Sequence, residues 1–139
     1  QNDQLVHPIS RIVRLTPTPA HWDMDYENGA VIHTENVMPY GRYIVILRGT
    51  TSKADVFFGL KLRVSVGGVV REFQPHDAHS DMHHVYGGTY IVGSGGGVLC
   101  VMGFELSYNS KVEFVLFSRG EKVRVGGGDL EIMRIGDNE

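Results

Sequence analysis

The chain is poor in cysteine, in clustered basic residues and in long apolar runs, and each shortage excludes something. Its 139 residues include one cysteine, Cys100, so an internal disulfide is excluded. The apolar neighbours of Cys100 predict a buried, unreactive thiol. No run approaches the roughly 20 apolar residues of a transmembrane helix, so we expect no membrane insertion. No basic run is present and the net charge is −3, which argues against a nucleic-acid partner.

Glycine is abundant, and this argues against helices. There are 18 glycines, and apolar residues make up 42% of the chain. Glycine weakens helices and marks turns and bulges, whereas the apolar fraction suffices for one folded core. We therefore expect a single domain over residues 1–139, with a loose arm at 1–8 and a solvated tail at 136–139. The chain begins with Gln1 and shows no signal peptide, so we expect a processed product or an excised domain.

The stretch Tyr40–Val66 predicts two long strands joined by a polar turn at Gly49–Lys53. Alternation in Asp55–Val66 puts Leu60, Leu62 and Val64 on a core face, with Lys61, Arg63 and Ser65 on a largely polar face. Gly67-Gly68 predicts a hairpin turn. Gly126–Gly128 is expected to lead into the last strand, Asp129–Ile135.

The whole pattern indicates about ten short strands and no helix. Strand Arg42–Arg48 is apolar on both faces, which is typical of a strand covered on both sides, by another layer or by a neighbouring subunit. The predicted fold class is therefore all-β, an antiparallel sandwich or barrel.

Three short motifs resemble the trimeric jelly rolls of the tumour necrosis factor and complement C1q-like superfamily. A strand at Arg11–Thr16 precedes an irregular segment containing Trp22, and Gly41-Arg42-Tyr43 is similar to the family's Gly-x-Tyr entry to a core strand. FELSYNSKVEFVLF is similar to a family strand–turn–strand unit, although Asn109-Ser110 replaces the usual Gly-Asp. The resemblance implies a jelly-roll homotrimer that binds ligands at subunit grooves or apical loops. Such heads occur in cytokines, innate recognition proteins and virion spikes or fibres.

A histidine-rich segment, QPHDAHSDMHH, is the most distinctive local feature. His76, His79 and His83 have a spacing that could bring three imidazoles to one divalent metal ion, and imidazole is a common metal ligand. The alternative is a polar loop without a ligand. If the metal reading holds, a metal-dependent, cupin-like β-barrel enzyme is the alternative function, although no Glu follows His84 before Gly93 as a cupin motif would require.

Trp22 and Tyr26 stand among Asp23, Asp25 and Glu27. Trp and Tyr are favoured in interface anchors and sugar-stacking sites, so Trp22, Tyr26, His79 and His83 are the predicted ligand-binding residues. The alternative for Trp22 is a structural role in closing one end of the barrel. No catalytic set emerges, and a nucleophile elbow is missing around Ser94.

The sequence thus predicts a non-enzymatic, homo-oligomeric recognition, adhesion or virion-surface head, most simply a trimer, without a required cofactor. Its partner would be a receptor, a glycan or an assembly partner, and its location extracellular or on a virion, with the cytoplasm as the alternative. A structural assembly or capsid decoration protein is a further alternative. Oligomeric binding would multiply weak single sites.

Overall fold

The computed structural model describes residues 9–15, 22–24, 29–51, 58–73, 83–92, 97–118, 121–123 and 125–136. The described residues form eleven strands and no helix, which confirms the predicted all-β class. No helix among them could therefore serve as a membrane span. The strands are β1 (Ile9–Leu15), β2 (Trp22–Met24), β3 (Ala30–Met38), β4 (Gly41–Thr51), β5 (Phe58–Val66), β6 (Val69–Phe73), β7 (His83–Val92), β8 (Gly97–Leu106), β9 (Ser110–Ser118), β10 (Glu121–Val123) and β11 (Val125–Gly136).

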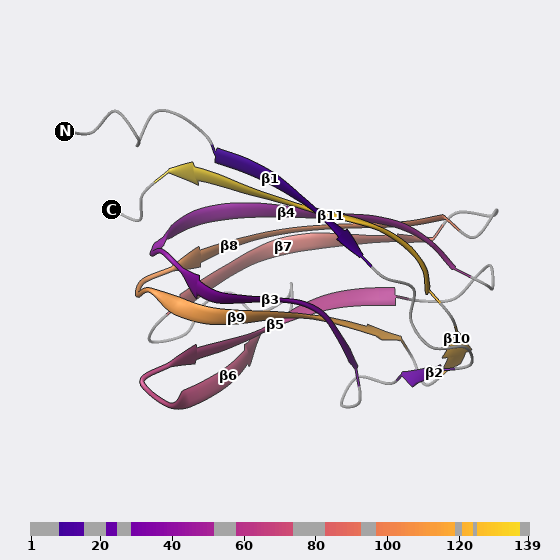
Figure 1. Cartoon of the computed structure of the whole chain (residues 1–139), viewed down its shortest axis with the longest axis horizontal. Helices are drawn as coiled ribbons and strands as arrows, with labels where there is room; N and C mark the ends of the chain where they lie inside the picture. Colours follow the sequence, from indigo (N-terminus) through magenta and orange to yellow (C-terminus); the bar gives the residue numbers. More distant parts are fainter. Residues whose placement is uncertain are drawn as a thin grey trace.

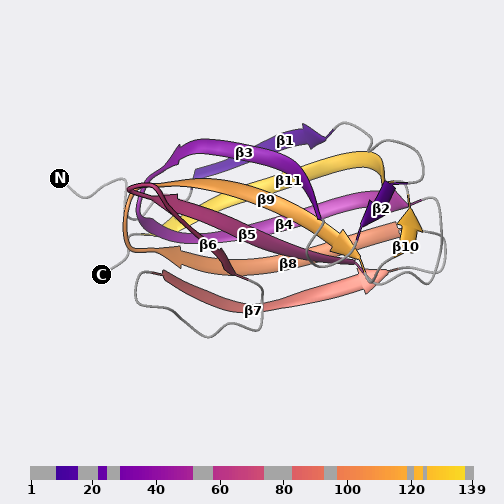
Figure 2. The ribbon, with the colours of Figure 1, turned by 90° about the horizontal axis from the view of Figure 1, so that it is seen from below.

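Two antiparallel sheets lie face to face and form a sandwich (Figure 1). The five-stranded sheet has the order β1-β11-β4-β8-β7, and the four-stranded sheet has the order β3-β9-β5-β6. The short pair β2–β10 forms a separate ribbon at one end of the sandwich, as Figures 1 and 2 show.

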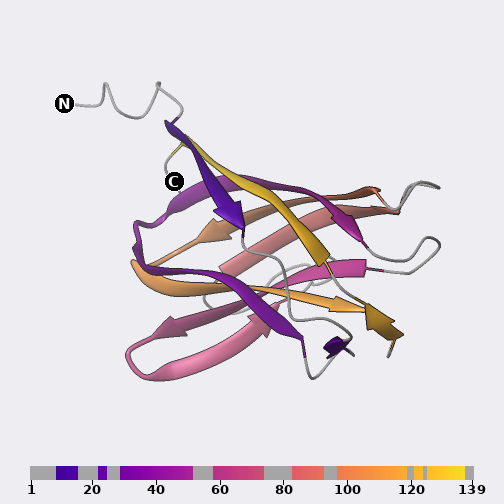
Figure 3. The same ribbon diagram turned by 45° about the vertical axis from the view of Figure 1, so that its right-hand side comes forward.

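The strand pairs are nested along the chain. β1 pairs with β11, β3 with β9, β4 with β8, and β5 with β6. The first half of the chain therefore runs back against the second half in reverse order. The rotated view in Figure 3 shows the two layers that result, with β3 and β9 side by side beneath β4 and β11.

The core lies between the sheets and follows the alternation of the strands. Tyr43, Val45 and Leu47 of β4 point into it, and all three are buried. At its centre, the ring of Phe104 lies 5.3 Å from that of Tyr43 and 6.3 Å from that of Phe114. These separations suit favourable aromatic pairs, so the two layers are joined by rings from both sheets.

Cys100 is buried in this core, as predicted. Desolvation in the apolar interior raises the pKa of its thiol to about 12. Since the thiolate is the reactive form, burial disfavours reaction of Cys100 in the folded chain.

The hairpin at Gly67-Gly68 is confirmed by the pairing of Val66 with Val69. Both glycines have positive φ, +57° and +85°, which a type I′ turn requires. The turn that joins β5 and β6 in the four-stranded sheet is therefore specified locally by the sequence.

Two predicted strand boundaries are wrong. β4 continues to Thr51, so Gly49 and Thr50 are in a strand rather than a turn. β11 begins at Val125 and includes the three glycines that were expected to precede it, with a bulge between Val125 and Gly128. Gly128 has a φ of +150°, and a Cβ there would lie 2.0 Å from the Arg48 carbonyl oxygen. Close approach of two backbones thus explains this glycine.

The predicted polar face of β5 is also wrong at Lys61. This side chain is 0% exposed and shares the outer face of the four-stranded sheet with Val115 and Phe117, which are buried as well. Its Nζ lies 5.8 Å from the centre of the Phe117 ring and 3.2 Å from Glu72 Oε1. The predicted alternation of β5 is correct, but its outer face is not solvated at Lys61. The buried ammonium group is stabilised there by an ion pair and by an aromatic ring.

Candidate functional site

The structure separates the two predicted contact regions. β2, which begins at Trp22, pairs with β10 at one end of the sandwich (Figure 1). β7 begins at His83, which lies opposite Leu106 at the other end, where Leu106 also pairs with Gly41. Trp22 and His83 therefore lie at opposite ends of the sandwich.

The other predicted ligands stay predictions. His76, His79 and Tyr26 lie outside the described residues. Among the residues that the structure describes, no group of three His, Cys, Asp or Glu side chains is arranged to hold a metal ion.

The outer face of the five-stranded sheet carries an apolar surface that we call the outer-face patch. The residues on it alternate with core residues in β1, β4, β8 and β11. Its strands are neighbours, because β11 pairs with both β1 and β4, and β4 pairs with β8. No described element covers this face (Figure 1). The patch consists of Ile12, Ile44, Ile46, Val101 and Met133.

Ion pairs flank the outer-face patch on two sides. On one side, Arg48 Nη2 lies 3.0 Å from Asp129 Oδ1 and 3.1 Å from Glu131 Oε1. On the other side, Arg42 Nε lies 4.0 Å from Glu105 Oε2. The hydrogen bond to Glu131 raises the pKa of Arg48, so its charge is fixed. Glu131 lies between Ile12 and Ile46 in the register, so this carboxylate is inside the patch, whereas Arg42, Glu105, Arg48 and Asp129 lie at its rim. Protein interfaces commonly combine apolar side chains with a polar rim.

The two outer faces of the sandwich differ in a way that bears on function. On the four-stranded sheet, Lys61 and Val115 are fully buried within one chain. On the five-stranded sheet, Ile44 and Ile46 remain partly exposed, and Ile12 is 56% exposed. The first face is thus covered at its centre within the chain, whereas Val31 and Val70 on its edge strands are 41% and 59% exposed. The face of the five-stranded sheet, which we call the open face, is exposed at its centre as well.

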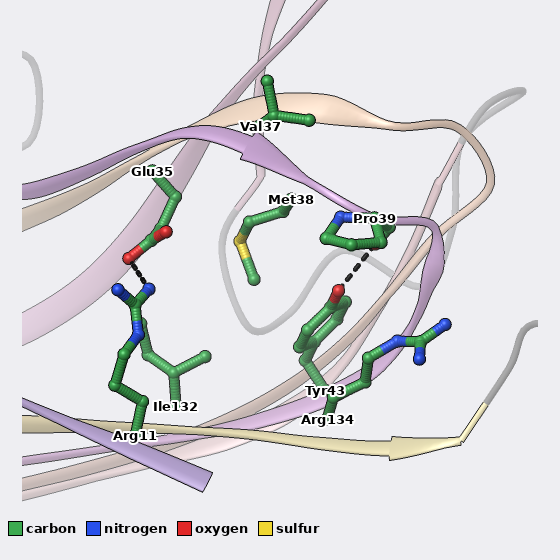
Figure 4. Close-up of a pocket in the computed structure, with 8 residues that line it drawn as sticks. All are labelled: Arg11, Glu35, Val37, Met38, Pro39, Tyr43, Ile132 and Arg134. Atoms are coloured by element: carbon green, nitrogen blue, oxygen red, sulfur yellow. Dashed lines mark hydrogen bonds and ion pairs between the residues drawn. The ribbon is translucent and has the colours of Figure 1, made fainter. Parts of the chain in front are cut away.

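A pocket of about 170 Å³ opens at the edge of the sandwich, between β3 of one sheet and β1 and β11 of the other (Figure 4). Buried core side chains form its interior: Met38, Tyr43 and Ile132. Figure 4 shows Met38 and Ile132 between two walls, with Arg11 and Glu35 on one side and Tyr43 and Arg134 on the other. Val37 and Pro39 complete the lining.

An ion pair joins the two sheets at the first wall of the pocket. Arg11 Nη2 of β1 donates to Glu35 Oε2 of β3. His33 Nε2 lies 2.5 Å from the same oxygen, and its ring stacks on Phe114 at 6.0 Å. A carboxylate only accepts hydrogen bonds, so His33 carries its proton on Nε2. Arg11 and His33 together hold Glu35 in place.

Backbone carbonyls position the second wall. Tyr43 OH donates to the Pro39 carbonyl oxygen at 2.6 Å, and Arg134 Nη2 donates to the Tyr40 carbonyl oxygen at 2.9 Å. The turn between β3 and β4 is held further by Tyr40 N, which donates to Asn109 Oδ1 at 3.0 Å. These bonds fix the shape of the pocket on the side opposite Glu35.

Sequence reasoning missed the pocket because its residues come from four strands that are distant in the chain. Arg11, Glu35, Tyr43 and Arg134 meet only through the pairing of β1 with β11 and the stacking of the sheets. The one available signal was a charged residue at a position of a strand where the alternation predicts an apolar one. Arg11, between Ile9 and Val13 on the same face, is the example.

No family model, curated protein or solved structure matches this chain. The resemblance to the tumour necrosis factor and C1q-like superfamily therefore depends on the residues of the chain itself.

Proposed function

We propose that this chain is the subunit of a non-enzymatic, homo-oligomeric recognition or virion-surface head, with the outer-face patch buried between copies. The observation that carries the proposal is the difference between the two outer faces. The chain covers the centre of one of them by itself, with Val31 and Val70 exposed on its edge strands, and leaves the centre of the other apolar and partly exposed. A second copy of the chain is the occupant that we assign to the open face.

The charges at the rim of the patch favour a copy of the same chain. The rim contains the arginines Arg42 and Arg48 and the acids Glu105 and Asp129, and Glu131 lies within the patch. Arg14 lies opposite Asp129 in the β1–β11 register and has no ion pair with any described residue. A surface with both signs can complement another copy of itself, as closed symmetric assemblies require.

The nested strand pairs support a jelly roll. Eight strands that pair first with last, in two four-stranded groups, are what a double-sheet jelly roll contains, and β1, β3, β4, β5, β6, β8, β9 and β11 pair in this way. In this proposal β7 is an added edge strand. Jelly rolls of the resembled superfamily are trimers, so a trimer is the assembly that we propose.

Recognition would use the two ends of the sandwich separately. Trp22 of β2 and His83 of β7 lie at opposite ends, so a trimer would display three copies of each region on different surfaces. Symmetric display strengthens weak single contacts through effective concentration. A glycan or a protein receptor is the partner class that we propose.

Sedimentation equilibrium of the full chain over about 1–100 μM protein tests the assembly. We expect a trimer for the wild type. Ile12→Glu and Ile46→Glu should raise the dissociation constant at least about tenfold, because each places a charge in the buried patch. Val70→Glu is the matched control, since Val70 is 59% exposed on β6, away from the patch; it should leave the assembly unchanged.

Ile12→Glu is the decisive variant, because an exposed side chain can be replaced without disturbing the core. Far-UV circular dichroism verifies that each variant is folded. A folded wild type that stays monomeric at the highest concentration would refute the proposal. Equal effects of Ile12→Glu and Val70→Glu would refute the assignment of the interface to this face.

A further inference from the structure

The edge pocket combines an apolar interior with an excess of positive charge at its walls. Its interior consists of the buried side chains Met38, Tyr43 and Ile132. Its charged groups are Arg11, Arg134 and Glu35, so two guanidinium groups (+2) and one carboxylate (−1) give a net charge of +1. An apolar site with a few placed polar groups is the usual form of a small-molecule site.

The volume of the pocket limits the apolar part of a ligand. At about 170 Å³, it is comparable to the engineered cavity of about 150 Å³ in another protein that binds benzene. One aromatic ring or one branched aliphatic group fits; a longer chain or a fused ring system does not.

The net positive charge of the pocket determines which polar group a ligand should carry. Glu35 accepts hydrogen bonds from Arg11 and His33, so this carboxylate balances part of the positive charge of the pocket and leaves the net charge at +1. Guanidinium groups bind carboxylates through charge-assisted hydrogen bonds. Figure 4 shows the guanidinium groups of Arg11 and Arg134 on opposite sides of Tyr43 and Met38, so an anion at the mouth experiences both.

We propose that this pocket binds a ligand built from one apolar ring and one carboxylate. Two sources share this chemistry: a free aromatic acid and the carboxy-terminal residue of a peptide. The pocket lies between the sheets and the outer-face patch lies outside them, so this inference does not depend on the proposed oligomer.

Two-dimensional NMR with labelled methyl groups tests the proposal, with hydrocinnamate as the probe and 2-phenylethylamine as its cationic counterpart. We expect hydrocinnamate to shift the methyl signals of Met38 and Ile132 in a saturable manner, with a dissociation constant of about 0.1–1 mM, as for a fragment-sized ligand. The amine should bind at least about tenfold more weakly. No shift of these methyl signals at saturating hydrocinnamate would overturn the proposal.

A charge cycle separates electrostatic recognition from a structural effect. Relative to the wild-type net charge of +1, Arg11→Gln leaves 0, Glu35→Gln leaves +2, and the double variant leaves +1. Hydrocinnamate should bind about 3–10-fold more weakly to the first, more tightly to the second, and as in the wild type to the double variant. Arg71→Gln, at an exposed arginine of β6, is the matched control and should have no effect.

The cycle can also contradict the proposal. If Arg11→Gln and Arg71→Gln weaken binding equally, the carboxylate is attracted by overall charge rather than by the pocket. If all variants bind the acid and the amine alike, the ligand class is wrong. Circular dichroism verifies that each variant is folded, which matters for Arg11→Gln because Arg11 joins the two sheets through Glu35.

A second arm distinguishes the two sources. A short peptide ending in a free Phe is compared with hydrocinnamate and with the same peptide amidated at its end. Tighter binding of the free-acid peptide assigns the site to chain termini, and tighter binding of hydrocinnamate assigns it to small acids; both results support the proposal. Equal binding of the amidated peptide would overturn it, because the carboxylate would then play no part.

Discussion

The buried ion pair on the four-stranded sheet gives a sharp test of how this sandwich is stabilised. Lys61 is fully buried, with Nζ 3.2 Å from Glu72 Oε1, and Arg63 Nε donates to Glu72 Oε2 at 2.6 Å. Glu72→Gln leaves the buried ammonium facing a neutral amide. We therefore predict that this substitution lowers the free energy of unfolding by about 1–3 kcal/mol at pH 7.

The magnitude follows from the exposure of the two partners. Breaking a fully buried pair costs about 3–5 kcal/mol, because one charge stays desolvated without its partner. Since the Glu72 side chain is 37% exposed, water screens part of the interaction, which places the cost near or below the lower end of that range. Lys61→Met removes the buried charge and keeps most of the volume, so it should change stability by less than about 1 kcal/mol in either direction.

The pH dependence of Glu72 provides a second readout. Partial burial tends to raise the pKa of Glu72, but the hydrogen bonds from Arg63 and Lys61 together lower it below the ordinary value. A lowered folded pKa means that ionised Glu72 stabilises the fold fully above its unfolded pKa, near 4.5. This contribution is lost as the pH falls through the folded pKa. The stability difference between wild type and Glu72→Gln should therefore shrink below pH 4.5.

Urea unfolding followed by far-UV circular dichroism measures these differences. One fixed protein concentration is needed, since assembly contributes to apparent stability. The variant Lys61→Met/Glu72→Gln should be more stable than Glu72→Gln alone. If Glu72→Gln equals the wild type at pH 7, or if the double variant is the least stable of the three, then Lys61 does not depend on Glu72 and the reasoning is wrong.

Three further predictions concern other parts of the chain. Gly59→Ala should destabilise the fold by about 1–3 kcal/mol in urea unfolding, because a Cβ would lie 2.3 Å from the aromatic ring that packs on it; Gly136→Ala, whose Cβ has its nearest contact at 3.5 Å, is the control and should cost less. Cys100, with a pKa of about 12, should not react with a thiol reagent at pH 8 until urea unfolds the chain, and rapid labelling of native protein would contradict its burial. Metal analysis of the purified chain tests the histidine segment: a bound divalent ion lost in His79→Ala/His83→Ala would support a metal site, and an equal metal content in both proteins would contradict it.

Local sequence patterns predicted the strands and their core-facing residues, but not which residues are buried on the outer faces of the sheets. The Gly67-Gly68 turn and the alternation of Leu60, Leu62 and Val64 depend on neighbours in the chain, so they could be read directly. Lys61 has the same alternation as Arg63, yet only Lys61 is fully buried. What covers a sheet face depends on tertiary packing, which a period of two residues does not encode.

The end of β4 and the start of β11 were misread for a related reason. Gly49 and Gly128 are opposite each other in the two strands, and the Cβ that Gly128 lacks would lie 2.7 Å from the Gly49 Cα. In the sequence, each glycine is a turn signal. In the structure, the two glycines permit the paired backbones of β4 and β11 to approach closely at a bulge. This role could be predicted only with the knowledge that β4 and β11 are partners.

The two outer faces show how differently charge can be used on one sandwich. On the four-stranded sheet, Lys61 is desolvated within the chain and is paired there with Glu72, so its charge acts on the internal packing of the chain. On the open face, Arg48 and Glu131 remain in contact with water, where such pairs contribute little to the stability of one chain. Burial between copies would exclude that water and strengthen the same pairs, while a wrong register would place like charges together. The charged rim would therefore act mainly on the register of assembly, and the apolar centre of the patch on its strength.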